Sequence, residues 1–127
     1  MFPGRGITAR LETPGTWTRN PDGSWSYQSA DGTNWSGWIV VGNRWYYVEE
    51  NGKLAIGWKN IEGKWYLFCT LTETEGEMLT GWQFVNGKWY FFGMPDTPEM
   101  GGMLTNATTP DNYRVGADGV WDGNAAQ

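Results

Sequence analysis

The chain has 127 residues, enough for one domain, and it carries a net charge of −5 and no histidine. The negative charge argues against a nucleic-acid ligand, because such binding depends on Lys and Arg side chains that neutralise phosphates. Without histidine, and with Cys69 as the only cysteine, the sequence offers neither the commonest general base nor a disulfide or thiolate metal cluster. We therefore predict no enzyme activity, cofactor or metal site, and interpret Cys69 as a small buried apolar residue.

Residues 1–16 are interrupted by Gly and Pro and are expected to form an irregular lead-in. They show no charged segment followed by an apolar one, so no signal peptide is predicted in this sequence. No apolar run reaches the length of about eighteen residues that a membrane-spanning helix needs, so no membrane span is predicted.

Residues 17–127 are predicted to form one module of repeats, each marked by two tryptophans. The second tryptophans are spaced 20, 20 and 24 residues apart, at Trp25, Trp45, Trp65 and Trp89. A Gly-Trp pair stands seven residues before the last three of them, at Trp38, Trp58 and Trp82. The first unit is degenerate, because Trp17 precedes Trp25 by eight residues. Short periods of this kind indicate a repeat architecture.

A turn signal lies between the paired tryptophans, at Gly42-Asn43, Glu62-Gly63 and Asn86-Gly87. Such dipeptides favour the positive φ angles of two-residue hairpin loops, and β-branched and aromatic residues flank them. Each unit is therefore predicted to be a β-hairpin in which Val85 opposes Lys88. Because side chains alternate between faces along a strand, this register places four aromatic residues on one face: Trp82, Phe84, Trp89 and Phe91.

The connections between units are polar and acidic, above all in residues 70–77, "TLTETEGE". Alternating glutamates suggest a calcium site, but no glycine-centred oxygen cage appears, which favours a solvated loop. Towards the end, "NYRVGADGVW" matches part of a repeat at Tyr113 and Trp121 and predicts a terminal cap over residues 106–121.

These features predict an all-β fold, a β-solenoid of stacked β-hairpin repeats. A lone hairpin is marginal in water, so each unit must bury an aromatic face against its neighbours. We see no apolar period of 3.6 residues with caps, so helix is expected to be nearly absent.

Paired tryptophans of one hairpin, with an aromatic residue of the next, would form a concave box. Sugars, nucleobases and quaternary ammonium ions all bind to such aromatic surfaces. The negative net charge of the chain disfavours nucleobases as ligands. Met78 and Met103 favour an ammonium ion, because a thioether can contact methyl groups. Each ring over a cation contributes about 0.5–2 kcal/mol, so one box binds weakly and several boxes are needed for useful avidity.

The segments "GWKNIEGKWYLF", "GEMLTGWQFVNGKWYFF" and "GGMLT" resemble the choline-binding repeats, also called cell-wall-binding repeats, of Gram-positive surface proteins, autolysins and phage lysins. The resemblance covers residues 17–121 and implies a left-handed superhelix of hairpins with choline between consecutive hairpins. The walls of each choline site would be two tryptophans of one repeat and an aromatic residue of the next, with a methionine nearby.

Carried over to this sequence, the resemblance implies a best site from Trp58, Trp65, Trp89 and Met78. At the preceding joint, meaning the contact between two consecutive hairpins, the walls would be Trp38, Trp45 and Trp65. Leu54 stands there in place of the methionine. The following joint offers Trp82, Trp89 and Met103, with Tyr113 or Trp121 as the third wall because Asn112 occupies the expected aromatic position. The first joint, with Trp17, Trp25 and Trp45, differs most from the pattern of the family, because Asn34 stands where that pattern has methionine.

The resemblance implies a non-catalytic module that attaches to choline or phosphocholine of teichoic acid at the extracellular surface of a bacterium. The resemblance is also compatible with a homodimer that forms through the last hairpins. The alternative is a carbohydrate-binding module, because related repeats in glucan-binding enzymes and clostridial toxins bind carbohydrates. An enzyme is a weaker third hypothesis, because no acid and base residues converge.

Overall fold

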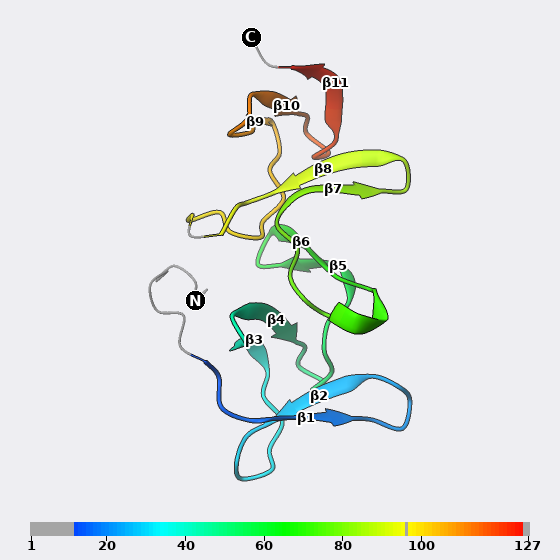
Figure 1. Cartoon of the computed structure of the whole chain (residues 1–127), viewed down its shortest axis with the longest axis vertical. Coiled ribbons are helices and arrows are strands. Elements are labelled where there is room, and N and C mark those ends of the chain that lie inside the picture. The colour runs from blue at the N-terminus through cyan, green and yellow to red at the C-terminus, as the bar shows by residue number, and fades with distance from the viewer. Residues whose placement is uncertain (1–11, 96, 126–127) are drawn as a thin grey trace. The chain divides into compact units, whose positions relative to one another are not determined.

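A computed structural model describes residues 12–95 and 97–125, and its regular structure consists of short antiparallel strands with one 3₁₀ turn, η2 (Thr72–Thr74) (Figure 1). The strands are β1 (Thr16–Arg19), β2 (Trp25–Gln28), β3 (Gly37–Val41), β4 (Arg44–Val48), β5 (Gly57–Ile61), β6 (Lys64–Phe68), β7 (Gly81–Val85), β8 (Lys88–Phe92), β9 (Ala107–Thr108), β10 (Tyr113–Val115) and β11 (Trp121–Ala125). They form four two-stranded sheets, β1-β2, β3-β4, β5-β6 and β7-β8, and one three-stranded sheet of order β11-β10-β9. The predicted all-β fold of successive hairpins is confirmed. Among the described residues, no helix is long and apolar enough to cross a membrane.

The predicted two-residue turns are present. Gly42 and Asn43 have φ angles of 62° and 67°, Glu62 and Gly63 of 52° and 89°, and Asn86 and Gly87 of 50° and 84°. Two successive positive φ angles define the turn whose twist matches that of the flanking strands. The dipeptides therefore fix where each hairpin reverses.

These turns set the predicted register. In the β7-β8 hairpin Val85 pairs with Lys88, and Trp82 pairs with Phe91. In the β3-β4 hairpin Val40 pairs with Trp45. The first hairpin differs, because its connection is longer and Trp17 pairs with Tyr27.

The chain forms two compact units. Unit 1 comprises the described parts of Met1–Lys59 together with Leu67–Met78, and unit 2 comprises Asn60–Tyr66 and the described parts of Leu79–Gln127. Buried aromatic and aliphatic side chains form the core of unit 1, at Tyr27, Ile39, Tyr46, Val48 and Leu54. In unit 2 the buried side chains include Tyr66, Phe91, Phe92, Met100 and Val115.

A recurring backbone hydrogen bond ties each connection to an earlier hairpin. In unit 1 the amide of Leu54 donates to the carbonyl of Trp25 at 2.7 Å, and the amide of Met78 donates to Trp45 at 2.8 Å. In unit 2 the amide of Met103 donates to the carbonyl of Trp65 at 2.9 Å. The positions of Leu54, Met78 and Met103 therefore share one backbone role, although their side chains differ.

Most of the predicted lead-in, residues 1–11, lies outside the described residues. Its last part contacts the β3-β4 hairpin. The amide of Thr13 donates to the carbonyl of Val40 at 2.7 Å, and the carboxylate of Glu12 accepts from the turn amides of Gly42 at 2.8 Å and Asn43 at 3.1 Å. These residues thereby satisfy backbone groups at the edge of the hairpin that would otherwise face water.

At the other end, residues 106–121 of the predicted cap contain β9, β10 and the first residue of β11, which continues to Ala125. The pairing of β10 with β11 shifts register between Tyr113 and Val115. Val120 forms an isolated bridge with Tyr90, which joins this sheet to β8 within unit 2.

Candidate functional site

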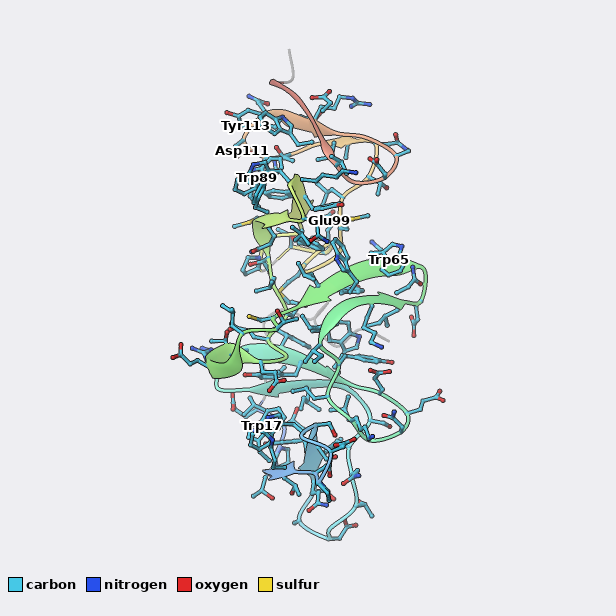
Figure 2. All side chains as sticks on the ribbon, turned by 90° about the vertical axis from the view of Figure 1, so that its right-hand side faces the viewer. Trp17, Trp65, Trp89, Glu99, Asp111 and Tyr113 are labelled. Carbon is cyan, nitrogen blue, oxygen red and sulfur yellow. The ribbon has the colours of Figure 1, made fainter. Side chains whose placement is uncertain are left out.

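Unit 2 contains a hollow of about 250 Å³ whose lining consists of four aromatic side chains, Trp82, Trp89, Tyr113 and Trp121. We call it the C-terminal hollow. Trp82 comes from β7, Trp89 from β8, and the other two residues come from the cap. Figure 2 shows Trp89 and Tyr113 in this part of the chain.

The four rings of the C-terminal hollow meet edge to face. The Trp82 ring lies 6.4 Å from that of Trp89 at 85°, and 6.4 Å from that of Trp121 at 70°. The rings of Tyr113 and Trp121 are 5.8 Å apart at 90°. This geometry is favourable for aromatic pairs and forms corners between ring faces, which carry partial negative charge. Trp89 remains 40% exposed, so its ring is accessible from solvent.

A carboxylate adjoins the C-terminal hollow. The indole nitrogen of Trp82 donates a hydrogen bond to Oδ2 of Asp111 at 2.9 Å, and the hydroxyl of Thr109 donates to Oδ1. The hydrogen bond from Thr109, followed by that from Trp82, lowers the pKa of Asp111. Asp111 is therefore ionised at neutral pH beside a ring of the hollow.

The sequence-predicted residues Trp82 and Trp89 are thus brought together with both alternatives for the third wall, Tyr113 and Trp121. Met103, predicted for the same joint, is partly buried and donates its amide to Trp65. Its side chain lies against Gly119, where an added Cβ would collide with the thioether.

Other predicted residues of unit 1 lie close to one another. The rings of Trp38 and Trp45 are 6.2 Å apart at 75°, and the Trp38 ring is 5.9 Å from that of Phe68. Trp45 is only 6% exposed. Met78 is also buried, and its backbone bonds to that of Trp45.

The predicted best site draws residues from both units. Trp58 and Met78 belong to unit 1, whereas Trp65 and Trp89 belong to unit 2. Trp65 is 44% exposed (labelled in Figure 2). This site stays a prediction. The role of Trp65 as a third wall beside Trp38 and Trp45 also stays a prediction.

Unit 1 contains a second hollow, of about 190 Å³, which we call the N-terminal hollow. Aromatic, aliphatic and acidic residues line it: Trp17, Trp25, Tyr46, Leu54, Glu73, Thr74 and Glu75. The ring of Trp17 lies 6.2 Å from that of Trp25 at 81°, and 5.1 Å from that of Tyr46 at 75°. Arg19 places its guanidinium 4.9 Å from the centre of the Trp25 ring, a cation–π contact within the protein.

The third aromatic wall of the N-terminal hollow differs from the expected one. The resemblance pointed to Trp45, but the lining residue is Tyr46, which directly follows it. Neighbouring residues of a strand point to opposite faces, and Trp45 packs with Trp38 instead. A sequence signal was available, because an aromatic residue follows the second tryptophan in three units, at Tyr46, Tyr66 and Tyr90.

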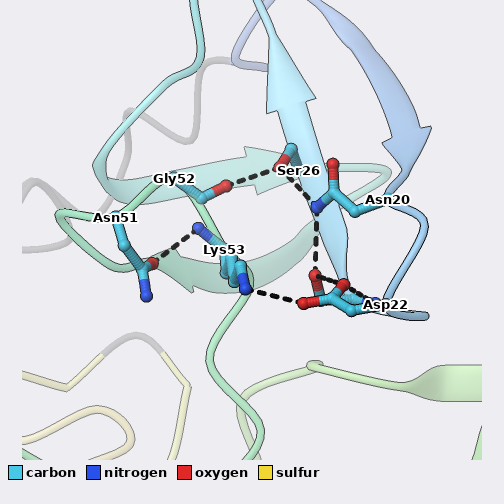
Figure 3. A network of polar contacts seen from close by, with 7 residues as sticks. Asn20, Asp22, Ser26, Asn51, Gly52 and Lys53 are labelled. Carbon is cyan, nitrogen blue, oxygen red and sulfur yellow. Dashed lines mark hydrogen bonds and ion pairs between the residues drawn. The ribbon is translucent and has the colours of Figure 1, made fainter.

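A polar network fastens the connection that carries Leu54 to the first hairpin (Figure 3). Lys53 forms a salt bridge with Asp22 at 2.6 Å, and the buried hydroxyl of Ser26 donates to the carbonyl of Gly52 at 2.7 Å. Asn20 donates its side-chain amide to Ser26 at 2.9 Å. The bonds from Lys53 and Ser24 lower the pKa of Asp22. Together these contacts hold Leu54 at the wall of the hollow.

The alternating glutamates do not converge on one point. Glu77 faces Arg44 at 3.7 Å, whereas Glu73 and Glu75 line the N-terminal hollow. In the part of the chain that the structure describes, no group of three or more His, Cys, Asp or Glu side chains could hold a metal ion. Cys69 is buried, as interpreted from the sequence.

Comparison with known families finds two matching models. Residues 81–121 match a choline-binding repeat, and residues 36–54 and 56–68 match a cell wall binding repeat. No curated protein matches the chain.

Solved structures of similar fold include choline-binding proteins. CbpJ from Streptococcus pneumoniae is 34% identical with a TM-score of 0.69, over 86% of this chain and 34% of CbpJ. CbpF, solved in complex with ipratropium, is 33% identical with a TM-score of 0.70, over 86% of this chain and 32% of CbpF. The choline-binding domain of Spr1274 from Streptococcus pneumoniae is 31% identical with a TM-score of 0.55, over 68% of this chain and 94% of that domain. The chain therefore spans about a third of CbpJ and CbpF and nearly all of the Spr1274 domain.

Proposed function

The chain belongs to the choline-binding repeat family, and we propose that it is a non-catalytic module that attaches to choline or phosphocholine on teichoic acid of a bacterial cell wall. Cell-wall-binding repeats imply a place at the bacterial cell surface. The observation that carries the proposal is the C-terminal hollow, because four aromatic rings line it.

The chemistry of this hollow suits a quaternary ammonium ion. Such a cation has no N–H group, so it needs ring faces and methyl contacts rather than hydrogen-bond acceptors. A sugar needs several hydrogen-bonding side chains that fix its orientation, and the hydroxyl of Tyr113 is the one such oxygen among the four lining side chains. The ionised carboxylate of Asp111 behind Trp82 adds attraction for a positive charge.

Binding at one hollow is expected to be weak. The ring faces and the buried methyl groups contribute about 4–8 kcal/mol, and association costs at least about 4 kcal/mol. A dissociation constant in the millimolar range follows. A teichoic acid chain presents choline repeatedly, so several sites on one module would add avidity of about 10²–10⁴.

We propose further sites at the predicted joints, each made of a tryptophan pair and an aromatic residue of the next hairpin. The tryptophan pairs are Trp38 with Trp45, where Leu54 replaces methionine, and Trp58 with Trp65, where Met78 would contact the choline methyl groups. Met103 would have the same role beside Trp82 and Trp89. The rings of Trp38 and Trp45 meet edge to face, as those of Trp82 and Trp89 do. This likeness supports the proposed site at Trp38 and Trp45.

Retention on a tertiary-amine resin, followed by elution with free choline, tests the proposal. The whole chain should bind and elute, and Trp89→Ala should weaken retention because it removes one wall of the C-terminal hollow. Leu71→Ala is the matched control, since Leu71 is 68% exposed and lines neither hollow. A chain that passes through the resin but binds dextran would instead support the carbohydrate-binding alternative.

A further inference from the structure

The N-terminal hollow differs chemically from the C-terminal one, because part of its wall is acidic. Glu73, Thr74 and Glu75 come from the connection that contains η2. This connection is four residues longer than its counterpart after β4, as the bridges Val48–Leu54 and Phe68–Met78 show. The extra residues bring two carboxylates to a hollow that already has three aromatic walls.

Hydrogen bonds fold this connection into a defined shape. The amide of Cys69 donates to the carbonyl of Glu77 at 2.8 Å, and the amide of Gly76 donates to the carbonyl of Cys69 at 2.7 Å. The thiol of Cys69 also lies 3.1 Å from the hydroxyl of Thr74. The two carboxylates are therefore presented at the hollow by an ordered loop and not by a free one.

The charges of these carboxylates are available to a ligand. Within residues 12–95 and 97–125, neither Glu73 nor Glu75 forms a salt bridge, whereas Glu77 faces Arg44. Glu75 is partly buried beside the rings, and Glu73 is exposed. An ammonium ion in the hollow would meet both negative charge and ring faces.

The two hollows suit different ammonium ions. A protonated primary or secondary amine carries N–H donors, and losing their hydration is costly unless acceptors replace the water. Carboxylates supply strong charge-assisted hydrogen bonds to such donors. Four aromatic rings, as in the C-terminal hollow, supply none and suit a methylated nitrogen better.

We propose that the N-terminal hollow binds a protonated primary or secondary amine. Its N–H groups would donate to Glu73 and Glu75, and its carbon chain would lie against Trp17, Trp25, Tyr46 and Leu54. The inference deepens the proposed function, because it assigns a second class of cation to a second site of the same module.

The test uses ethanolamine, its N-methyl and N,N-dimethyl derivatives, and choline, each titrated into the whole 127-residue chain. The readout is the indole N–H signals in NMR spectra, with Trp17→Phe and Trp82→Phe used to assign a signal to each hollow. We expect the Trp17 signal to respond at lowest concentration to ethanolamine and at highest to choline. The Trp82 signal should show the opposite order.

Glu73→Gln with Glu75→Gln should weaken ethanolamine binding at the Trp17 signal about tenfold, because it removes the charge from both acceptors. Glu50→Gln, an exposed carboxylate outside the hollow, is the matched control and should leave binding unchanged. The inference is overturned if choline binds the N-terminal hollow as tightly as ethanolamine, or if the double variant binds ethanolamine like the parent chain. Failure of the proposed function is distinct, because it appears as a Trp82 signal that choline does not move.

Discussion

The indole nitrogen of Trp82 donates a hydrogen bond to the carboxylate of Asp111, 29 positions later in the chain, at 2.9 Å. The bond links the β7-β8 hairpin to the connection between β9 and β10, so it fixes one wall of the C-terminal hollow. It also places a negative charge at the edge of a ring whose face is exposed to the hollow. Both effects favour a cation on that face.

Asp111→Asn should weaken choline binding about two- to threefold, which is about 0.5 kcal/mol, because the negative charge beside Trp82 is lost. The effect is small because the carboxylate is exposed and solvent screens it. Calorimetric titration with choline at low and high salt measures it, and the difference from the parent should shrink as salt rises.

Asp118→Asn is the matched control for this substitution. Asp118 lies in the same cap, and its Oδ1 accepts from the amide of Val120, a role that asparagine can keep. It removes one charge without touching Trp82. Equal loss of affinity in both variants would mean that net charge matters and the bond to Trp82 does not.

Ser26→Ala should destabilise unit 1 by about 1–3 kcal/mol, because the buried carbonyl of Gly52 loses its hydrogen bond. Thermal unfolding followed by tryptophan fluorescence reports the change. Ser36→Ala, at an exposed serine of the next connection, should leave stability nearly unchanged. If both variants melted like the parent, the network in Figure 3 would not hold the connection in place.

Glu62→Asn should stabilise the chain by about 0.5 kcal/mol, because asparagine tolerates positive φ better than glutamate does. Glu62 has a φ angle of 52° in the turn between β5 and β6. Chemical denaturation measures the difference. Glu50→Asn, at an exposed position without a positive φ angle, is the control, and a destabilised Glu62→Asn variant would contradict the turn geometry.

Acid should destabilise the fold below the usual pKa of aspartate. Hydrogen bonds from Ser29 and Thr33 lower the pKa of Asp31 to about 2, and those of Asp22 and Asp111 are also lowered. A lowered pKa in the folded state stabilises it above the unfolded value of 3.8, and this contribution is lost as the pH falls through the folded pKa. Melting temperatures should therefore be constant between about pH 7 and pH 5 and decline towards pH 2. A melting temperature that rises on acidification would contradict these assignments.

The hairpins and their register could be predicted from the sequence because local chemistry determines them. The dipeptide Asn86-Gly87 fixes its turn, and strand alternation then decides which residues share a face with Trp82. The prediction that Tyr113 lies with Trp82 and Trp89 came instead from the resemblance to the choline-binding repeats, because it requires the packing of one repeat on the next.

The N-terminal hollow could not be predicted in the same way. Its third wall, Tyr46, depends on how one hairpin packs against the next, which the register within a hairpin does not determine. Glu73 and Glu75 reach it only because the hydrogen bonds around Cys69 fold an inserted connection in one particular way. The sequence showed an acidic loop, but nothing in its spacing indicated the hollow that it lines.

Titration of choline into the whole chain, followed at the indole N–H signals of Trp82 and Trp89, tests the central claim most directly. Both signals should shift together along one saturation curve, with a dissociation constant in the millimolar range. Trp121→Ala should raise that dissociation constant, because it removes one wall of the hollow that Trp82 and Trp89 also line. Signals that stay in place at saturating choline, while the protein remains folded, would contradict the assignment of the C-terminal hollow as a choline site.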